Sequence, residues 1–510
     1  MAGTASIHGS ISEDHTEFLL HSYRRIRQTV SERSSDATTL PDPAELAHAI
    51  AALPHAGNTD FLSPRGAPAA LEHILSALAP GLNNQNLSGR YYGFVTGGVL
   101  PVAEAADNVV TALDQNVQVN MPGHSAAPAV EDAALSMLVA LLELGPDADW
   151  PARTFTTGAT GSNVLGLACG REAVVARRAE GVSVAEVGFL AACQVAGIKG
   201  IQVLTSMGHA SLSKAASIVG LGHHAVKELP ASPEEPWRLD LDAVERELAR
   251  EGVASIVAVS AGEVNTGRFA TNALDMPKLR SLADRYGAWV HVDGAFGIFA
   301  RALPKTDEFL NLHANVAGLE LADSIAADGH KILNVPYDAG IFLCRDASIP
   351  SQVFQNPNAA YLATPSRAGG AIIHSALNVG LENSRRFRAL PVYAVLLSEG
   401  RQGIASMVAR MVALARELAA YIRASEDYEW LPDKDAPLEN SFMVVLFRAM
   451  DPALNEVLVD RINATRKIFV SGTKWKGQKA CRIAVSNWRA DAAKDLPIVQ
   501  EVLTSVAQQQ

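Results

Sequence analysis

The sequence predicts an α/β fold built around a mostly parallel sheet. Between about residues 100 and 390, short apolar runs alternate with segments of helical spacing, as in sheets whose parallel strands are buried on both faces. The helical spacing is clear at residues 164–178 and 274–286. The apolar runs predict strands at residues 154–157, 201–205, 255–260, 289–293, 324–327 and 341–344.

Composition and charge exclude several classes of protein. The chain has 510 residues, of which 48% are hydrophobic, and a formal net charge of −11. These values are typical of a compact protein of roughly two to four domains rather than a disordered one. Because the chain is acidic and has no cluster of Lys and Arg, we expect no nucleic-acid partner. Its four cysteines are scattered without metal-ligand spacing, so we expect neither a metal site nor a disulfide framework.

The N-terminal segment carries no targeting signal. Residues 1–13 are polar and lack the basic and apolar regions of a signal peptide. No apolar run reaches the length of about 18 residues that a membrane span needs. The sequence therefore predicts a cytoplasmic protein without a membrane partner.

The pattern along the chain predicts three parts and one long loop. The small C-terminal domain begins with a helix at 393–423, interrupted near Gly400, and continues with strands at 442–447 and 481–485. Residues 351–370 are rich in Asn, Pro, Ser and Gly, which predicts a long mobile loop with a functional role. The predicted parts are an N-terminal helical arm at 1–100 with a helical pattern from Phe18 to Val30, a large ligand-binding domain at 101–390, and the small domain at 391–510.

Two charged residues stand at the ends of neighbouring predicted strands. Lys331 follows one strand within Asp328-Gly-His330-Lys331, on the side where open α/β sheets bind ligands. Its amine could form a Schiff base with an aldehyde cofactor or a carbonyl substrate. Asp293 ends the strand before it, where a carboxylate could hold a pyridinium nitrogen protonated. If each residue is considered alone, Lys331 could equally be an ordinary surface lysine, and Asp293 could be an aspartate that caps a turn or helix.

Two further features stand at strand ends. The turn that contains Ala159, Thr160, Gly161 and Ser162 opens a helix, so its free N–H groups and hydroxyls could bind a phosphate. It matches neither the dinucleotide motif nor the P-loop motif. His209 follows another strand and could stack on a planar cofactor or transfer protons. An ordinary glycine turn and a structural histidine are the alternatives, but the order of the four features strengthens the functional interpretation.

With these motifs the chain resembles a known family, the pyridoxal 5′-phosphate (PLP) dependent group II amino-acid decarboxylases, relatives of aromatic-amino-acid and glutamate decarboxylases. The similarity covers roughly residues 85–490. The matching motifs are Arg90-Tyr-Tyr-Gly-Phe, Thr160-Gly-Ser-Asn, His209-Ala-Ser, Gly262-Glu-Val-Asn-Thr-Gly, His291-Val-Asp293-Gly-Ala, Asp328-Gly-His330-Lys331, Ser384-Arg385-Arg386-Phe-Arg and Val485-Ser-Asn-Trp488.

The resemblance implies a fold, an assembly and a set of site residues. The fold would be that of the aspartate-aminotransferase-like PLP enzymes of type I, with a seven-stranded sheet, in a homodimer with shared active sites. Lys331 would be the Schiff-base lysine, Asp293 the partner of the pyridine nitrogen and His209 the stacking histidine. Tyr361 would be the catalytic loop tyrosine, unless that role falls near His374. The other cofactor-binding positions would be Ala159, Thr160, Gly161, Ser162, Ala295, Asp328 and His330.

Three residues depart from the pattern of better-known relatives. Asp328 stands where they carry Asn, Ile332 where an aromatic residue usually follows the lysine, and Glu263 where Thr or Asn is more frequent. These departures bear on which substrate the pocket accepts and on which product the reaction gives.

The predicted activity is the decarboxylation of an L-amino acid to CO₂ and an amine. An aromatic substrate is favoured because Tyr91, Tyr92 and Phe94 could line the pocket, although all three could be core residues. An acidic substrate would need an arginine, for which the candidates are Arg386, Arg388 and Arg482. The alternatives are an aldehyde synthase and a C–C or C–S lyase. A non-catalytic PLP-binding interaction protein is disfavoured because Lys331 and Asp293 are both present.

Overall fold

A computed structural model describes residues 11–34, 38–57, 61–117, 123–356, 366–368 and 371–508 of the chain. The α-helices are α1 (Ile11–Ser34), α2 (Pro43–Ala51), α3 (Ala67–Glu72), α4 (Pro101–Ala112), α5 (Ala127–Leu141), α6 (Ala159–Ala176), α7 (Val184–Val187), α8 (Phe189–Val195), α9 (Ala210–Ile218), α10 (Leu241–Leu248), α11 (Asp275–Tyr286), α12 (Leu310–Val316), α13 (Gly329–Ile332), α14 (Ser348–Phe354), α15 (Ala389–Ala424), α16 (Pro452–Ala464) and α17 (Ala492–Gln508). The strands are β1 (Asn116–Val117), β2 (Ala152–Thr156), β3 (Gly200–Thr205), β4 (Val226–Glu228), β5 (Val253–Ser260), β6 (Trp289–Asp293), β7 (Ser324–Asp328), β8 (Gly340–Cys344), β9 (Ser366–Ala368), β10 (Ala371–Ile373), β11 (Arg385–Arg386), β12 (Tyr428–Leu431), β13 (Val444–Ala449), β14 (Ser471–Trp475) and β15 (Gln478–Ala484).

The central sheet has seven strands in the order β2-β8-β7-β6-β5-β3-β4. Strands β4, β3, β5, β6 and β7 pair in parallel, and β8 runs antiparallel to both of its neighbours. This confirms the predicted α/β fold with a mostly parallel sheet. The sequence analysis missed β4, because this short edge strand is only partly buried and has no continuous apolar run.

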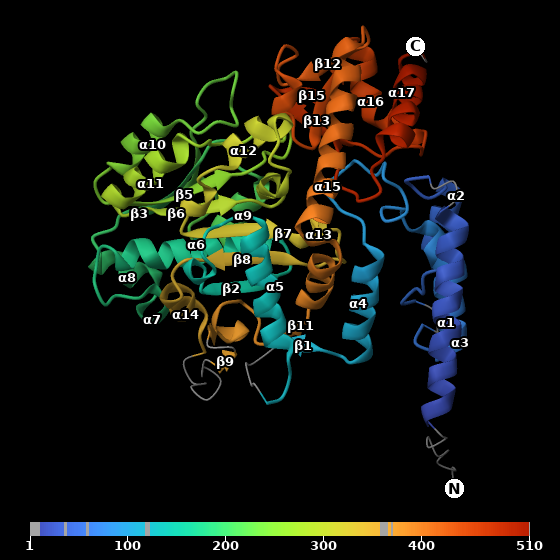
Figure 1. The fold of residues 1–510 in the computed structure, drawn as a ribbon, viewed down its shortest axis with the longest axis horizontal. Helices are drawn as coiled ribbons and strands as arrows, with labels where there is room; N and C mark the ends of the chain where they lie inside the picture. The colour runs from blue at the N-terminus through green and yellow to red at the C-terminus, as the bar shows by residue number, and fades with distance from the viewer. Residues whose placement is uncertain are drawn as a thin grey trace.

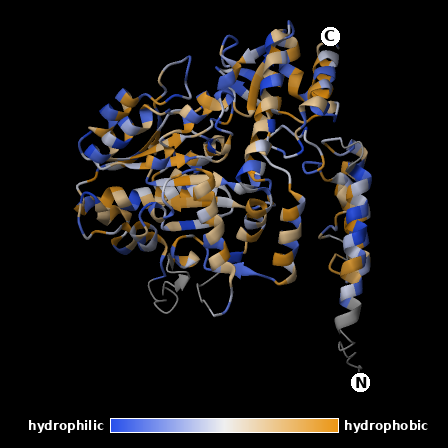
Figure 2. Cartoon of the chain, viewed as in Figure 1, coloured by the Kyte–Doolittle hydropathy of each residue, from blue (hydrophilic) through white to orange (hydrophobic). Residues whose placement is uncertain are grey.

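Helices cover both faces of this sheet, so its strands contribute to two separate cores. In β5, Ile256 and Ala258 pack on one face, and Val257 and Val259 pack on the other. This alternation follows from the two-residue repeat of a strand. Helix α6 lies over the first face, and α10 and α11 lie over the second (Figure 1). Hydropathy follows the same layers, with hydrophobic residues gathered in the central strands (Figure 2).

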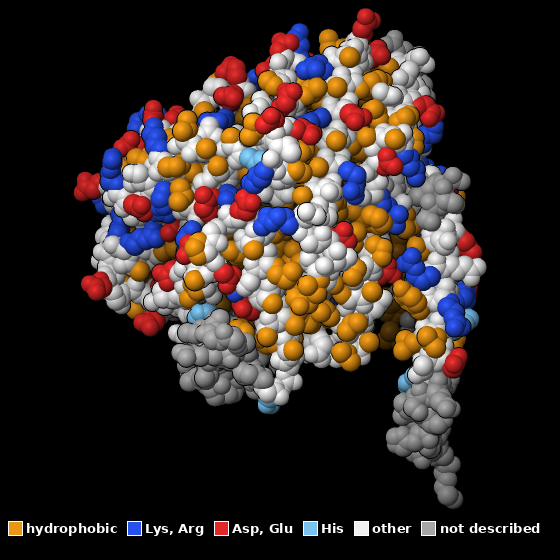
Figure 3. Space-filling view, viewed as in Figure 1, with side chains coloured by type: hydrophobic (Ala, Val, Ile, Leu, Met, Phe, Trp, Pro, Cys, Tyr) orange, Lys and Arg blue, Asp and Glu red, His pale blue; other side chains and the backbone are white. Residues whose placement is uncertain are grey.

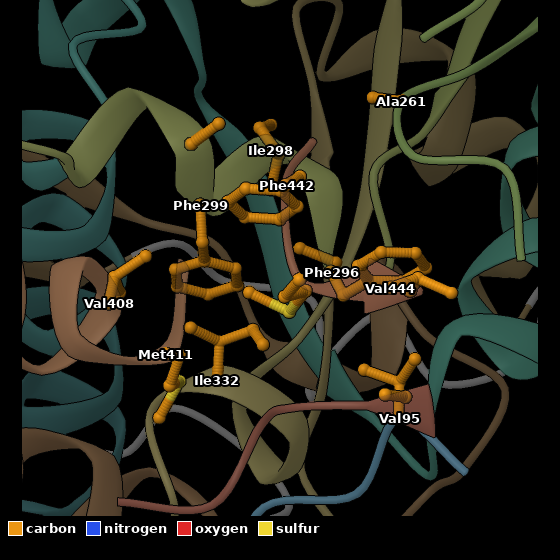
Figure 4. Packing of buried hydrophobic residues seen from close by; sticks show 14 of the residues in the cluster. Val95, Ala261, Phe296, Ile298, Phe299, Ile332, Val408, Met411, Phe442 and Val444 are labelled. Atoms are coloured by element: carbon orange, nitrogen blue, oxygen red, sulfur yellow. The ribbon is translucent and has the colours of Figure 1, made fainter. Parts of the chain in front are cut away.

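A second sheet lies in the C-terminal part, where β12, β13, β15 and β14 pair antiparallel in that order. Helices α15, α16 and α17 stand against it (Figure 1). Helix α15 is interrupted at Gly400, whose φ is 57°, as the sequence predicts. Phe442 stacks on Phe296 of the large domain with ring centroids 6.3 Å apart, and Phe299 and Met411 continue this packing (Figure 4). The two sheets therefore share one hydrophobic core.

The N-terminal helix α1 runs along the side of the molecule beside α3 (Figure 1). Arg27 of α1 forms an ion pair with Glu104 of α4 at 3.1 Å, and Arg25 pairs with Glu72 of α3 at 2.7 Å. Domain boundaries near residues 100 and 390 stay predictions.

The predicted loop at 351–370 is wrong at both of its ends. Residues 351–354 belong to α14, because Val353 and Phe354 pack against the core under the central sheet. Strand β9 pairs antiparallel with β10. Tyr361 lies outside the described residues.

Three findings concern the described part of the chain as a whole. No helix there is long and apolar enough to cross a membrane. No group of His, Cys, Asp and Glu side chains in the same residues is placed to hold a metal ion. The four cysteines are buried and form no disulfide.

Candidate active site

A cavity of about 820 Å³ opens at the carboxyl ends of the central strands. The carboxyl ends of parallel strands meet at one edge of a sheet, which brings together residues that are far apart in the sequence. The predicted site residues that line this cavity are Ala159, Thr160, Gly161, His209, Asp293, Ala295, Asp328, His330 and Lys331.

The start of α6 presents free backbone donors to the cavity. Gly158 precedes the helix with a φ of 143°, a conformation that favours glycine, and no side chain caps the helix. The N–H of Ala159 donates to Asp328 at 2.7 Å, whereas the N–H groups of Thr160 and Gly161 have no acceptor among the described residues. Ser162 differs from its predicted neighbours, because it is fully buried and its hydroxyl bonds to that of Thr156 at 2.8 Å.

A chain of buried hydrogen bonds orients Asp293. The Asn163 amide donates to Asp293 Oδ2 at 2.9 Å, and Asn163 Oδ1 lies 3.0 Å from His291 Nε2. Because an amide oxygen only accepts, His291 carries its proton on Nε2, and its Nδ1 accepts from Ser324 Oγ at 2.8 Å. Burial lowers the pKa of His291 to about 4, so its ring is neutral.

Lys331 and Asp328 form an ion pair inside the cavity. Lys331 Nζ lies 2.9 Å from Asp328 Oδ2, and only 1% of Asp328 is exposed. The Nδ1 atom of His330 accepts a hydrogen bond from the N–H of Ala339 at 3.1 Å. The ring centroids of His330 and Tyr337 are 4.0 Å apart. Burial lowers the pKa of His330 and raises that of Tyr337, so both side chains are neutral at pH 7.

His209 is the N-cap residue of α9. Its Nδ1 accepts from the N–H of Ser211 at 3.2 Å, so the proton of the neutral ring lies on Nε2. Burial lowers its pKa, and the nearby Asp293 carboxylate raises it by a smaller amount. His209 therefore presents a neutral ring to the cavity.

Of the three arginines that the sequence offers as substrate partners, Arg482 of β15 lines this cavity. Its guanidinium donates to Ser471 Oγ at 3.1 Å and to the carbonyl oxygens of Val264 and Gly93, each at 2.9 Å. Among the described residues, no carboxylate lies within ion-pair distance of Arg482. Burial lowers the pKa of Arg482, and the Glu263 carboxylate in the same cavity raises it by a smaller amount. The sequence analysis missed Tyr337, although it lies only six positions after Lys331 and also lines the cavity. The sequence could not place β15 beside the central sheet.

The residues that depart from the family pattern have different surroundings. Ile332 is buried in the hydrophobic core and does not line the cavity (Figure 4). Glu263 lines the cavity, and its two oxygens accept four hydrogen bonds from Asn265 and Thr266 at 2.8–2.9 Å. Burial raises the pKa of Glu263. Glu263 therefore holds the turn after β5 in shape.

Among the residues considered for substrate selection, few reach the cavity. Tyr92 is fully buried, and Tyr91 packs against Phe469 with centroids 4.6 Å apart, so Phe94 alone of the three aromatic candidates lines the cavity wall. Arg386 pairs with Asp107 at 2.7 Å and Arg388 with Asp338 at 2.6 Å, and neither arginine lines the cavity.

Fold and cavity together define an α/β protein with a helix N-terminus that has free N–H groups and with a lysine amine at the ends of its parallel strands. The conserved domain of pyridoxal-dependent decarboxylases matches residues 106–449. The chain therefore belongs to the pyridoxal-dependent decarboxylase family, and PLP is its cofactor.

Individual relatives support this assignment. The chain is 30% identical over 324 residues to an L-2,4-diaminobutyrate decarboxylase of Acinetobacter baumannii, a match that covers 61% of this chain and 58% of that protein. It is 25% identical over 301 residues to an aromatic-L-amino-acid decarboxylase of Bacillus atrophaeus, covering 58% of this chain and 60% of the relative. The matches thus span less than two thirds of the length of these relatives. The structure of Oryza sativa TDC with PLP and tryptamine has the same fold, with a TM-score of 0.79, 21% identity and 99% coverage of both chains.

The residues present fit PLP. A phosphate needs several donors, and the unbonded N–H groups of Thr160 and Gly161 at a helix N-terminus would supply two of them. A pyridine nitrogen needs an oriented carboxylate, which Asn163 provides by holding Asp293. The amine of Lys331 lines the same cavity.

The buried histidine behind Asp293 makes stability depend on pH. Its pKa is 6.5 in the unfolded chain and about 4 in the folded one, so stability is fully present above pH 6.5 and is lost as the pH falls toward 4. Between pH 7 and pH 5 this histidine should lower the free energy of unfolding by about 2 kcal/mol. Urea unfolding of the wild type and of His291→Gln at both pH values measures this. The variant should show a smaller loss, and an equal loss in both proteins would contradict the neutral buried ring.

Proposed function

We propose that this chain is a PLP-dependent decarboxylase of L-amino acids that releases CO₂ and an amine. The observation that carries the proposal is the composition of one cavity wall. Lys331, Asp293 and the start of α6 line it together with Arg482, a cation with no carboxylate partner among the described residues. Family membership supports the same reaction.

Each part of the cofactor has a proposed partner. The N–H groups of Thr160 and Gly161 would bind the phosphate, Asp293 would keep the ring nitrogen protonated, and Lys331 would supply the amine that bonds to the aldehyde. When bound, PLP supplies a carbonyl that takes up the substrate amine and a ring that accepts the electron pair left when CO₂ departs. Ala295 and His209 would provide the cavity walls beside the ring.

Arg482 is the proposed partner of the substrate carboxylate. Its hydrogen bonds to two backbone carbonyls and a hydroxyl hold the guanidinium in place without neutralising its charge. A carboxylate that enters the cavity restores the missing ion pair, which favours binding because the arginine is already desolvated. Arg482 thereby selects substrates by their carboxylate.

After CO₂ leaves, a proton must reach the α-carbon. We propose Tyr361 as the donor, because the alternative His374 lines a different pocket beside Arg153 and Asp132. An aldehyde synthase would consume oxygen and form peroxide and ammonia, so product analysis separates this alternative from the proposed reaction. Phe94 and Tyr337 are aromatic residues of the cavity wall, and they support an aromatic substrate.

Borohydride reduction tests the cofactor linkage and turnover tests the reaction. Reduction of the purified holoenzyme should fix a phosphopyridoxyl group on Lys331, as peptide mass mapping will show. Lys331→Ala should lose at least about 10³-fold in CO₂ release from the best of the common L-amino acids, because it lacks the amine that bonds to the cofactor. Lys278→Ala, on the exposed surface, is the control. A label on another lysine, or an aldehyde product with peroxide, would contradict the proposal.

Removal of the Arg482 charge should weaken substrate binding more than turnover. For Arg482→Gln we expect the KM to rise at least about tenfold with a smaller fall in kcat, because a charged hydrogen bond to the substrate is lost. Arg482→Lys keeps the charge and should recover part of the affinity. Equal KM values in the wild type and Arg482→Gln, with cofactor absorbance retained, would show that the carboxylate binds elsewhere.

We also propose a homodimer with shared active sites. Hydrophobic side chains gather on the face over α4, α5 and the start of α15 (Figure 3). In this region Val109, Leu113 and Leu397 are 47%, 64% and 61% exposed, and such patches are typical of interfaces. Phe94 and Tyr337 line the active-site cavity although about half of each is exposed, which suits a second chain that covers them.

Sedimentation tests the assembly. At micromolar concentration the protein should sediment as a particle of twice the chain mass of 54.0 kDa. Combined Val109→Asp and Leu113→Asp substitutions should shift it toward the monomer, because they place charges in an apolar contact. Leu274→Asp, at a site that is 83% exposed, is the matched control. A monomeric wild type would contradict the proposal.

The proposed location is the cytoplasm. All four cysteines are free, which suits a reducing compartment.

A further inference from the structure

A second cavity of about 760 Å³ lies between the large domain and the C-terminal sheet, and it shares no lining residue with the active site. One wall comes from the segment before α10 and from α12, and the other comes from β12 and the loop that follows it (Figure 1). Neither the sequence motifs nor the proposed reaction gives this cavity a role.

Arg268 lies in the wall of this cavity, and its guanidinium forms no hydrogen bond or ion pair with a described residue. Only 7% of the residue is exposed. Burial lowers its pKa to about 10, although the nearby carboxylates of Asp433 and Glu235 oppose this shift, so Arg268 still carries a charge at pH 7. A buried arginine that has no hydrogen bond destabilises the fold unless a bound group satisfies its donors. The group that arginine binds best is a carboxylate or a phosphate.

The other charges of the cavity distinguish between these two ligands. Glu234, Glu235, Asp433 and Asp435 line it and form no ion pair with a described residue, and the same holds for the cations Arg268, Lys434 and Lys476. A wall that carries both acidic groups and cations suits a molecule that carries one negative and one positive group better than a doubly charged phosphate. Trp237 and Phe269 add two aromatic wall residues, of which 9% and 4% is exposed.

We infer that this cavity binds an aromatic amino acid as a zwitterion, with its carboxylate on Arg268, its ammonium group on the acidic residues, and its side chain against Trp237 and Phe269. The ligand chemistry is that of an α-amino acid, and the site is separate from the one at Lys331.

The position of Arg268 connects this site to the active-site wall. The turn after β5 runs from Gly262 to Arg268, and Gly262, Glu263, Val264 and Asn265 line the active-site cavity. The N–H of Glu263 donates to the carbonyl of Arg268 at 2.6 Å, so the two ends of the turn move together. Val264 also accepts a hydrogen bond from Arg482 at 2.9 Å. A ligand held by Arg268 would therefore bind beside the same turn that lines the active-site cavity and that accepts a hydrogen bond from Arg482.

Binding is measured on borohydride-reduced holoenzyme, in which the aldehyde of the cofactor no longer reacts with amino acids. Equilibrium dialysis uses labelled L-phenylalanine and L-tryptophan as probes. At least one of them should bind, with an affinity at least tenfold weaker in Arg268→Gln and restored to within threefold of the wild type in Arg268→Lys. Arg246→Gln, an exposed arginine outside the cavity, should bind as the wild type does.

Derivatives of the probe that binds test the two charges separately. Its N-acetyl form lacks the ammonium group and its amide lacks the carboxylate, and each should bind at least tenfold more weakly. Failure of both probes to bind, or equal binding by wild type and Arg268→Gln, overturns the inference. Inorganic phosphate that competes fully with the probe shows a simple anion site and overturns the zwitterion. These outcomes do not depend on which product the active site forms.

Discussion

The close packing of α6 on the central sheet supports both ends of the active site. A Cβ atom on Gly166 would come within 2.3 Å of the His291 ring, and one on Gly170 within 2.9 Å of Ile256 and Trp289. Glycine at these positions lets the helix approach the strands more closely than any side chain allows. The same approach brings the free N–H groups of the first turn to the cavity and Asn163 to Asp293. A helix held farther from the sheet would lose the proposed phosphate site and the orientation of the carboxylate together.

The buried ionisable side chains form two groups, those with close partners and those without an ion pair. Asp328 has Lys331 and the N–H of Ala159 as partners, and Glu263 accepts four hydrogen bonds within its own turn. Arg482 and Arg268 have no carboxylate partner among the described residues, and each faces a cavity. Because desolvated ions without an ion pair destabilise a fold, Arg482 and Arg268 are the buried cations that a bound carboxylate would stabilise.

The C-terminal sheet packs against the large domain and also contributes a residue to the active-site cavity. Phe442 and Phe296 join the two cores, and β15 carries Arg482 to the active-site cavity. The turn from Gly262 to Arg268 lies between the two cavities and is closed by a hydrogen bond from Glu263 to Arg268. A change in the position of the small domain would therefore alter both cavities at once.

The sequence alone determined the elements whose signal is local. Continuous apolar runs predicted six of the seven central strands, since parallel strands buried on both faces need such runs. Motif order placed Lys331, Asp293, His209 and the start of α6 at strand ends, and the parallel topology then brings these ends together. Only the tertiary structure decided which distant side chains meet. Arg482 and Arg268 became candidate ligand-binding residues because neither forms an ion pair with a described carboxylate. Ser162 and Ile332 are buried and do not line the cavity. A missing ion pair and the direction of a buried side chain depend on contacts across hundreds of residues, so no local pattern records them.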